Sequence, residues 1–353
     1  MPNSSGRQFL IQGRNILITG GTGTIGSALA RAILQYKPAV LRVFSRDETM
    51  QFQLQQQLGD LANVRYLIGS VFDAPRLAMA MEDIDIVFHV AAMKHVPACE
   101  YNPFEAVKTN VIGTENIIEQ SIAADVKLVV GISTDKVVNP TSVMGTTKLL
   151  AEKLLIAANL TKGKHRTVFS CVRFGNVIGS RGSVIPVFME QVRKEKPLTV
   201  TDPQMTRFFM EIDAAVDLLL KATSLAKGGE VFILLMPSVR VMDIAQSIVD
   251  RYHAVSGNRL PIEISGQRTG EKLFEELVTD DELSKLYLFE DLLIIPSEHG
   301  PPPPGVPLRD SGQTAVTSSV AQEPITQTDI LRLLRNNDPD NLLKLSEMKE
   351  LLR

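Results

Sequence analysis

The sequence predicts an α/β protein with a doubly wound parallel sheet and a smaller, interleaved C-terminal lobe. Short apolar runs alternate with longer segments of helical periodicity through residues 16–172. Closely spaced glycines lie between the first apolar run and the first helical segment, and the alternation breaks after Gly175. Strands joined by helices of this length pair in parallel, because each helix returns the chain to the same end of the sheet.

The first half of the chain supplies the elements of the sheet domain. Strands are expected at residues 16–18, 40–44, 64–68, 84–90, 128–132 and 167–172, and helices at residues 24–35, 47–58, 75–81, 103–123 and 143–160. Buried parallel strands appear as continuous apolar runs, whereas helices carry apolar residues three and four positions apart. Right-handed crossovers then place helices on both faces of the sheet.

The second half is expected to complete the sheet and build the lobe. Helices are expected at residues 186–194, 213–225 and 241–252, and strands at residues 198–200, 231–235 and 262–264. We assign residues 12–178 and about 208–238 to the sheet domain, and residues 179–207 and about 239–290 to a substrate-binding lobe. Residues 291–353 are expected to form a stiff Pro-rich linker and two tail helices, at 327–334 and 341–352, that pack on the body or on a neighbouring subunit.

The glycine-rich segment predicts a dinucleotide site of the Rossmann type. Gly20, Gly23 and Gly26 follow the strand at three-residue spacing and open the first helix. The first glycine allows a tight turn, the second lets a pyrophosphate approach the backbone, and the third lets helix and strand pack closely. Free N–H groups at the helix start favour a negatively charged phosphate. The alternative is a plain tight turn.

Composition excludes several classes of partner. The 353 residues are 44% hydrophobic and 22% charged, with a net charge of -3, which gives no electrostatic reason to expect nucleic acid or membrane binding. Cys99 and Cys171 lack metal-ligand spacing, so we expect neither a metal site nor a disulfide framework. No apolar run reaches the ~18 residues that span a bilayer, and residues 1–12 lack the apolar segment of a signal peptide. A cytoplasmic protein is expected.

The residues after the second strand bear on the choice of cofactor. Ser45-Arg46-Asp47 lies where a dinucleotide-binding sheet meets the adenosine ribose. Arg46 with Ser45 favours a 2′-phosphate, and therefore NADP, whereas a carboxylate favours the free 2′-hydroxyl of NAD. We expect NADP, with NAD as the alternative. Ser45 or Asp47 acting only as a helix N-cap is the other interpretation.

Two further strand ends carry candidate site residues. After the fourth strand, the small Ala91 and Ala92 let the backbone pass close to a cofactor, and Lys94 can hold a phosphate or a sugar hydroxyl. His95 is a candidate for the same site or a local hydrogen-bonding residue.

After the fifth strand, Thr134 precedes an acid and an amine, Asp135 and Lys136, which can divide proton transfers between them. Met144 and Lys148 follow on one face of a helix. A surface ion pair is the alternative interpretation of Asp135 and Lys136.

Thr134, the position of Met144, and Lys148 resemble the Ser/Thr–Tyr–Lys triad of extended short-chain dehydrogenases/reductases. From about residue 12 to 288 the chain is also similar to inverting UDP-N-acetylglucosamine 4,6-dehydratases, which are nucleotide-sugar dehydratases of polysaccharide biosynthesis. The motifs that carry this similarity are Ser45-Arg46-Asp47-Glu48, Lys94-His95-Val96-Pro97, Cys99-Glu100-Tyr101-Asn102-Pro103, Lys108-Thr109-Asn110, Ser133-Thr134-Asp135-Lys136 and Arg181-Gly182-Ser183-Val184-Ile185-Pro186.

The resemblance implies a role for each site residue. Asp135 is the acid that helps the sugar C6 hydroxyl leave, Lys136 is the base at C5, Thr134 bonds the C4 oxygen, and Lys148 holds the nicotinamide ribose. The cofactor-binding residues are expected to be Gly20, Thr22, Gly23, Thr24, Ile25, Gly26, Ser45, Arg46, Asp73, Ala91, Ala92, Lys94 and Lys148. Those binding a UDP-sugar are expected to be Lys94, Asn176, Val184, Arg207, Arg268 and Glu271. We also expect a homo-oligomer.

Two positions depart from the family pattern. Met144 occupies the usual tyrosine position, and its thioether cannot take a proton from the C4 hydroxyl. Ser70 follows Gly69 where the family often has an aspartate, which leaves Asp73 as the expected adenine contact. Two alternatives stay open: a nucleotide-sugar 4-epimerase, which needs no proton transfer at C5 or C6, and a non-catalytic NADP-binding regulator.

Overall fold

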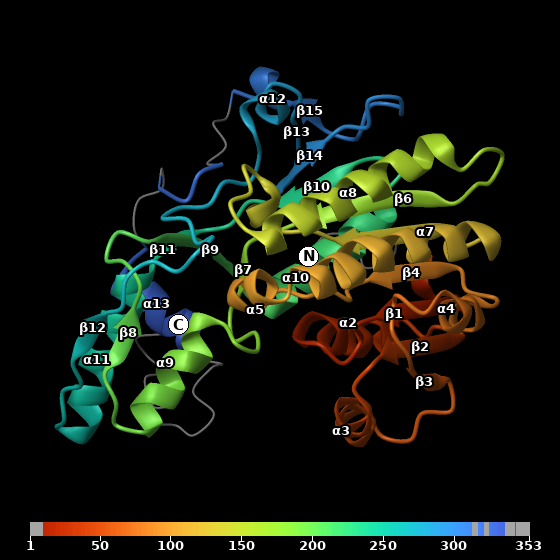
Figure 1. Cartoon of the computed structure of the whole chain (residues 1–353). Coiled ribbons are helices and arrows are strands. Elements are labelled where there is room, and N and C mark those ends of the chain that lie inside the picture. The colour runs from red at the N-terminus through yellow and green to blue at the C-terminus, as the bar shows by residue number, and fades with distance from the viewer. Residues whose placement is uncertain (1–9, 313–316, 321–324, 336–342, 344–353) are drawn as a thin grey trace.

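The computed structural model describes residues 10–312, 317–320, 325–335 and 343. A large sheet with helices on both faces forms one part of the molecule, and a smaller lobe lies beside the end of that sheet (Figure 1). Within the described residues, no helix combines the length and the apolar character needed to cross a membrane.

The large sheet has the strand order β15-β13-β14-β10-β6-β5-β4-β1-β2-β3. Its parallel strands are β1 (Asn15–Thr19), β2 (Val40–Ser45), β3 (Val64–Ile68), β4 (Ile86–His89), β5 (Leu128–Ile132), β6 (Val168–Arg173) and β10 (Val231–Leu234). The order reverses between β1 and β4, as in a Rossmann-type doubly wound sheet, and ligands bind outside the carboxyl ends of the strands at such a switch point. The predicted fold class is confirmed.

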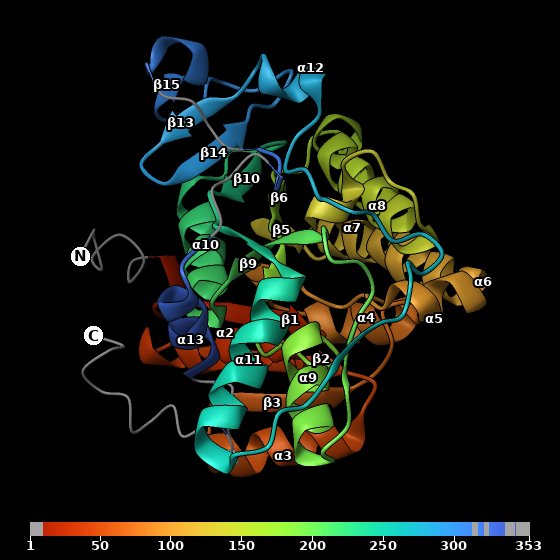
Figure 2. The ribbon, with the colours of Figure 1, turned by 90° about the vertical axis from the view of Figure 1, so that its left-hand side faces the viewer.

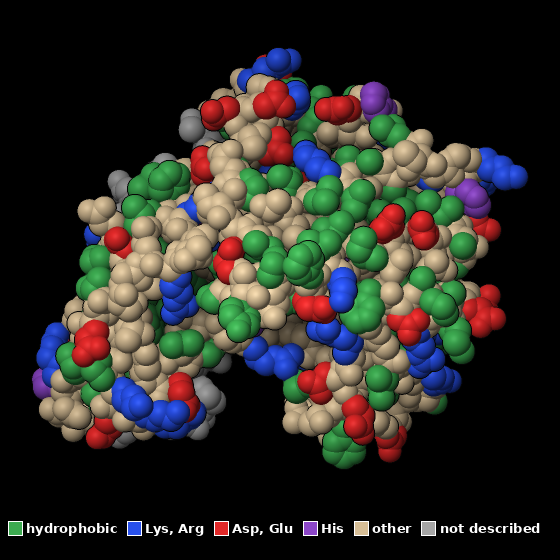
Figure 3. Space-filling model, in the orientation of Figure 1, with side chains coloured by type: hydrophobic (Ala, Val, Ile, Leu, Met, Phe, Trp, Pro, Cys, Tyr) green, Lys and Arg blue, Asp and Glu red, His purple; other side chains and the backbone are tan. Residues whose placement is uncertain are grey.

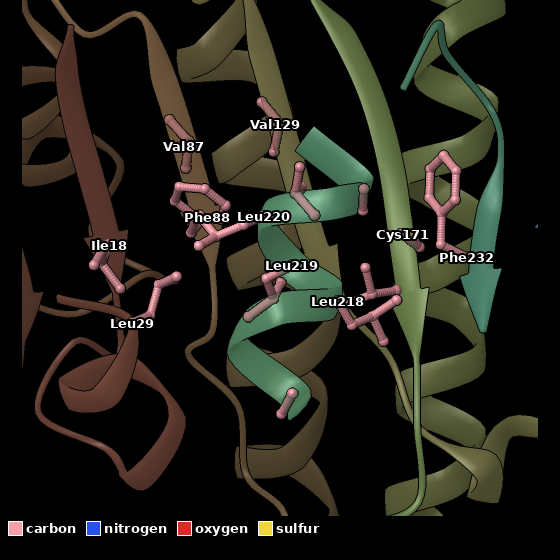
Figure 4. Close-up of a cluster of buried hydrophobic side chains, with 14 of the residues drawn as sticks. Ile18, Leu29, Val87, Phe88, Val129, Cys171, Leu218, Leu219, Leu220 and Phe232 are labelled. Atoms are coloured by element: carbon pink, nitrogen blue, oxygen red, sulfur yellow. The ribbon is translucent and has the colours of Figure 1, made fainter. Parts of the chain in front are cut away.

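Helices cover both faces of this sheet. On one face α2 (Thr24–Gln35) packs against α10 (Ile212–Leu225), and on the other α7 (Gly113–Ala123) lies between α4 (Ala74–Met81) and α8 (Val143–Thr161) (Figure 2). Figure 4 shows Leu218, Leu219 and Leu220 of α10 in one buried cluster with Phe88 and Val129 of the strands. The other helices of this part are α3 (Glu48–Leu58), α5 (Val96–Tyr101), α6 (Pro103–Ala106) and α12 (Asp280–Leu283), with 3-10 turns η2 (Asp135–Val137) and η3 (Leu308–Asp310).

The helix expected over residues 103–123 is interrupted by a π-helical segment, η1 (Val107–Ile112), between α6 and α7. Within it, Asn110 is buried, and its side chain accepts a hydrogen bond from the Met93 N–H at 2.8 Å and donates one to the Met93 carbonyl at 3.1 Å. The wider turn thus presents Asn110 to the loop that follows β4. Such segments often occur at functional sites.

The far edge of the large sheet corrects the expectation for residues 291–353. Strand β14 (Leu292–Ile295) pairs antiparallel with β10, and β13 (Tyr287–Phe289) and β15 (Val306–Pro307) continue the sheet beyond it. The expected boundary at residue 290 therefore falls inside a β-hairpin of the sheet domain. The physical reason is that the apolar run Leu292–Ile295 is buried against the otherwise open edge of β10.

The lobe has its own hydrophobic core. It contains α9 (Val184–Arg193), α11 (Val241–Ser256), the paired strands β8 (Leu198–Val200) and β12 (Ile262–Ile264), and α13 (Gln327–Leu334), which packs on α11. A small sheet of β7 (Asn176–Val177), β9 (Thr206–Met210) and β11 (Ser238–Arg240) joins it to the sheet domain. The helix expected at 341–352 lies outside the described residues, apart from Leu343, which is buried in this core.

Candidate active site

Two adjoining cavities lie at the carboxyl ends of the parallel strands. The large cleft, of about 680 Å³, runs from the glycine loop past β5, and the small cavity, of about 250 Å³, lies between the end of β5 and the lobe. Lys94, His95, Lys136 and Asn176 line both, so the two spaces meet at these residues. A hollow separates the lobe from the sheet domain in the space-filling view (Figure 3).

The glycine loop is packed too closely for side chains. Gly20 has φ +64°, and a Cβ there would lie 2.8 Å from the backbone of Ala91. A Cβ on Gly26 would lie 2.4 Å from the Gly20 carbonyl oxygen. No side chain caps α2 at its N-cap residue, Gly23, so backbone N–H groups at this helix end face the large cleft. This cradle fits a dinucleotide pyrophosphate.

Most residues predicted to bind the cofactor line the large cleft. They are Gly20, Thr22, Gly23, Thr24, Ile25, Ser45, Arg46, Ala91, Ala92, Lys94 and Lys148. Gly26 lies behind the loop, where its role is close packing.

Asp73 departs from its expected place as an adenine contact. It is not among the residues that line the large cleft, and its carboxylate accepts the Arg76 N–H at 3.1 Å as the N-cap of α4. Ser70 does line the cleft, and its hydroxyl is buried without a hydrogen-bond partner among the described residues. Asp73 immediately precedes the first residue of α4, and free N–H groups at a helix start need an acceptor, which explains the capping role.

The end of β2 presents a cation to the cleft. The Ser45 and Thr22 hydroxyl oxygens lie 2.7 Å apart, which ties the strand end to the glycine loop. Asp47 caps α3 by accepting the Met50 N–H at 2.9 Å. Arg46 is exposed and lines the cleft. Asp47 lines the cleft as well, so a guanidinium and a capping carboxylate both lie at this end of it.

Arg181 closes the cleft from the lobe side, and sequence reasoning gave it no role. Its guanidinium donates to the Thr22 carbonyl at 2.6 Å, and its backbone N–H donates to Thr24 Oγ1 at 3.3 Å. Burial and the charge of Arg181 lower the pKa of Lys94. Arg181 therefore contacts the glycine loop, Lys94 feels its charge, and a bound polyphosphate in the cleft would balance the two cations.

The predicted acid–amine pair is formed after β5. Asp135 is fully buried, and its Oδ1 accepts hydrogen bonds from Thr134 Oγ1 at 2.9 Å and from Lys136 Nζ at 2.9 Å. Lys136 Nζ also donates to Asn176 Oδ1 at 3.1 Å. Thr134 and Lys136 line the large cleft, whereas Asp135 lies behind them. The structure thus excludes a simple surface ion pair.

The charges around Lys136 favour its ammonium form. Burial acts to lower the pKa of Lys136, but the carboxylates of Asp135 and Glu275 outweigh it, and the pKa is raised. Glu275, which sequence reasoning did not select, lies 3.7 Å from Lys136 Nζ. Its neighbour Glu276 points elsewhere, to Asn139, and no sequence pattern distinguishes the two glutamates.

Met144 and Lys148 lie side by side on α8, as predicted, and both line the large cleft. Met144 is 4% exposed and packs with Cys99 and Ala106. Lys148 Nζ donates to the Ile132 carbonyl at 2.5 Å, and burial lowers its pKa. Position 144 is therefore an apolar wall, and Lys148 is the amine nearest to it on this helix face.

A buried ion network supports the strand ends from behind. Ser133 Oγ donates to Glu152 at 2.5 Å, and Glu152 pairs with Arg173 at 2.6 Å. Arg173 also reaches Glu282 of α12 at 2.9 Å. The network fixes the residue that immediately precedes Thr134.

The small cavity is lined by every residue predicted to bind the substrate: Lys94, Asn176, Val184, Arg207, Arg268 and Glu271. The guanidinium of Arg207 donates to the Thr206 carbonyl at 2.7 Å and to the Lys272 carbonyl at 2.7 Å. Its Nη2 lies 3.8 Å from Glu271. Arg207 thus anchors the 268–275 segment as well as lining the cavity.

Comparison with known proteins gives a family and close relatives. Residues 16–297 match the family described as polysaccharide biosynthesis protein. A protein of Methanocaldococcus jannaschii named as an uncharacterized membrane protein is 51% identical over 285 residues, which cover 80% of this chain and 85% of that protein. An inverting UDP-N-acetylglucosamine 4,6-dehydratase of Campylobacter jejuni is 42% identical over 288 residues, covering 81% and 84%.

The X-ray structure of Pen from Bacillus thuringiensis superposes with a TM-score of 0.86 at 45% identity, over 93% of this chain and 98% of that chain. A Rickettsia canadensis protein named UDP-glucose 4-epimerase is 38% identical over 289 residues, covering 81% and 83%.

Proposed function

Since this chain belongs to the polysaccharide biosynthesis protein family, we propose that it is a nucleotide-sugar 4,6-dehydratase that acts on UDP-N-acetylglucosamine and inverts C5. The observation that carries this proposal is the hydrogen-bonded Asp135–Lys136 pair at the junction of the two cavities. The Campylobacter jejuni protein that is 42% identical to this chain is named for the same substrate and supports this choice.

The large cleft fits a nicotinamide dinucleotide. The glycine loop and Arg181 would hold its pyrophosphate, Arg46 a 2′-phosphate, and Lys148 the nicotinamide ribose. When bound, the nicotinamide supplies a hydride acceptor for C4 and a hydride donor for C6. The exposed Arg46 beside Ser45 favours NADP over NAD, because a guanidinium bonds a phosphate with two parallel N–H groups.

The small cavity would hold the UDP end of the substrate. Arg268, Lys272 and the lobe residue Val184 line it, and Asn176 stands where it meets the large cleft. A diphosphate near these cations places the hexose beside Lys136. This arrangement would bring the hexose, the Lys136 amine and the nicotinamide ring of the cofactor together.

The chain's own residues then carry the protons. Thr134 bonds the C4 oxygen. Lys136 passes a proton to Asp135 along their hydrogen bond and, as a neutral amine, then takes the C5 proton, which an adjacent C4 ketone makes acidic. Asp135 supplies the proton that lets the C6 hydroxyl leave as water. Because Asp135 is fully buried behind Thr134 and Lys136, that proton reaches the cleft along the hydrogen bond to one of them. Solvent water accepts the C4 hydroxyl proton when C4 is oxidised and later returns a proton to C5 from the opposite face, which inverts that centre.

Two other functions have a specific observation in their favour. The relative named UDP-glucose 4-epimerase favours epimerisation, but a 4-epimerase has no use for the Asp135–Lys136 pair. The apolar side chain of Met144 favours a non-catalytic cofactor-binding regulator, whereas the retained Lys148 in the cleft counts against it.

One experiment separates the three. The protein is incubated with UDP-N-acetylglucosamine in D₂O, and the sugar is followed by NMR. A dehydratase gives a 4-keto-6-deoxy product with deuterium at C5. An epimerase gives the C4 epimer without C5 deuterium, and a regulator leaves the sugar unchanged. Either of the last two results would refute the dehydratase proposal.

A further inference from the structure

Glu275 is a buried carboxylate that the chemistry above does not use. Its side chain is 3% exposed and lines the small cavity. Oε1 lies 3.7 Å from Lys136 Nζ and 3.8 Å from Arg207 Nε, and Oε2 lies 3.8 Å from Lys272 Nζ. Oε2 is buried and makes no hydrogen bond within the described residues. A carboxylate held this way faces the candidate base without being fixed to it.

Lys136 consequently lies between two carboxylates that come from distant parts of the chain. Asp135 adjoins it on the turn after β5, and Glu275 approaches from the segment that follows β12. The neutral Asn176 amide completes its contacts. Both carboxylates lie within 4 Å of Lys136 Nζ in a buried space, so each favours the charged form of the amine.

We propose that Glu275 is a positioning residue that keeps the Asp135–Lys136 pair singly protonated from the lobe side. The inference rests on the dehydratase function proposed above. Glu275 would touch neither the sugar nor the cofactor in this role. It would act through Lys136, while Arg207 and Lys272 hold its own charge in place.

The proton balance shows why one proton on the pair matters. At rest the pair is an ammonium and a carboxylate, and transfer along the 2.9 Å hydrogen bond gives a neutral Lys136 and a protonated Asp135. Lys136 then gains the C5 proton as the C5–H bond breaks. Asp135 releases its proton along the hydrogen bond to Thr134 or Lys136, and the departing C6 hydroxyl receives a proton there and leaves as water. The pair ends with one proton, as it began, and loss of that proton at alkaline pH would remove the acid.

The groups that face Glu275 decide how it titrates. Lys136, Arg207 and Lys272 are the cations, and Asp135 is the nearby anion. Burial raises the pKa of Glu275, with Asp135 adding to the effect and the cations opposing it. At alkaline pH, where the pair would lose its proton, Glu275 is ionised and stabilises the ammonium.

The direct test measures the reactivity of Lys136 without any substrate. The protein is labelled with trace acetic anhydride at mildly alkaline pH, and acetylation of the Lys136 peptide is measured by mass spectrometry. Glu275→Gln removes the carboxylate charge with little change in shape. The pKa of Lys136 should fall, because one of its two carboxylates is gone, and its labelling should rise about tenfold. The matched control is Glu276→Gln, which removes the same charge outside the cavity and should leave the labelling unchanged.

Catalysis supplies the second readout. The alkaline limb of the kcat profile should move down by about one pH unit in Glu275→Gln, with a smaller change in KM, and Glu275→Asp should restore part of the shift. If Glu275→Gln does not fold, Glu275→Asp is labelled in its place, and a rise of about twofold or more is expected because its carboxylate lies farther from Lys136.

Labelling that is equal in the wild type and the variants at position 275 would overturn the inference. A wild-type protein that forms no 4-keto-6-deoxy product would refute the proposed function, and the labelling result would still decide whether Glu275 controls Lys136.

Discussion

Replacing Lys136 with methionine tests both the proposed base and the buried charge cluster. The Lys136→Met side chain keeps most of the aliphatic volume and removes the amine. It leaves Asp135, which is fully buried, with only the Thr134 hydroxyl as a hydrogen-bond donor to its Oδ1. Glu275 keeps Arg207 and Lys272 at 3.8 Å. The uncompensated charge is therefore that of Asp135.

The size of the effect follows from this difference between the two carboxylates. Breaking a buried ion pair by removing one partner costs about 3–5 kcal/mol. Glu275 retains Arg207 and Lys272 as partners. We therefore expect a loss at the lower end of this range, about 3 kcal/mol in the free energy of unfolding at neutral pH. Turnover should fall about 10²–10⁴-fold, because the proposed base is gone.

The pH dependence of the stability difference has a defined sign. The folded-state pKa of Lys136 is raised above its ordinary value of 10.5. Its contribution is therefore fully present below that ordinary value and is lost as the pH rises through the folded pKa. The difference between wild type and Lys136→Met should stay constant through neutral pH and shrink only in strongly alkaline solution.

Three measurements check the reasoning. Urea unfolding across pH gives the stability difference, with the exposed Lys164→Met as the control for losing a lysine. NMR in D₂O follows exchange at C5, which should be abolished. The absorbance of reduced nicotinamide should still appear, because the proposed mechanism oxidises C4 without Lys136. Retained C5 exchange would mean that the base is elsewhere, and unchanged stability would mean that Asp135 does not depend on Lys136.

Two further substitutions address the other open assignments. Met144→Ala should retain measurable turnover, whereas Asp135→Asn, which keeps the shape but cannot supply the proton, should be far more damaging in assays of 4-keto product. Equal losses would put position 144 on the proton path. Arg46→Glu should weaken NADP more than NAD by about 1.5–3 kcal/mol, roughly 10- to 150-fold in Kd by calorimetry, because a charged bidentate contact is lost. Similar losses for both cofactors would show that Arg46 contacts a part that they share.

Local pattern was enough to predict most elements and the neighbourhood of the site. The strands at 64–68 and 128–132 and the helix at 24–35 lie where the periodicity predicts them. Because carboxyl ends of parallel strands meet at one edge of a sheet, residues that follow β1, β2, β4 and β5 had to gather around one cleft. The glycine spacing predicted a tight turn and close packing of the first helix on the first strand, and the structure leaves no room for a Cβ at Gly20 or Gly26.

Tertiary contacts decided which segments pair and which side chains reach the site, and the local sequence pattern could not predict either. The run Leu292–Ile295 becomes a strand because β10 offers it a partner some sixty residues earlier, and the prolines that follow it suggest a linker when taken alone. Asp73 is a capping residue because a helix begins there, although its spacing also suits a ligand contact. Of the adjacent Glu275 and Glu276, only the first is brought to Lys136. The sequence by itself determined which chemical groups this chain carries near its strand ends. Long-range packing determined which of those groups are buried together, because burial and charge pairing bring together segments that are far apart in the chain.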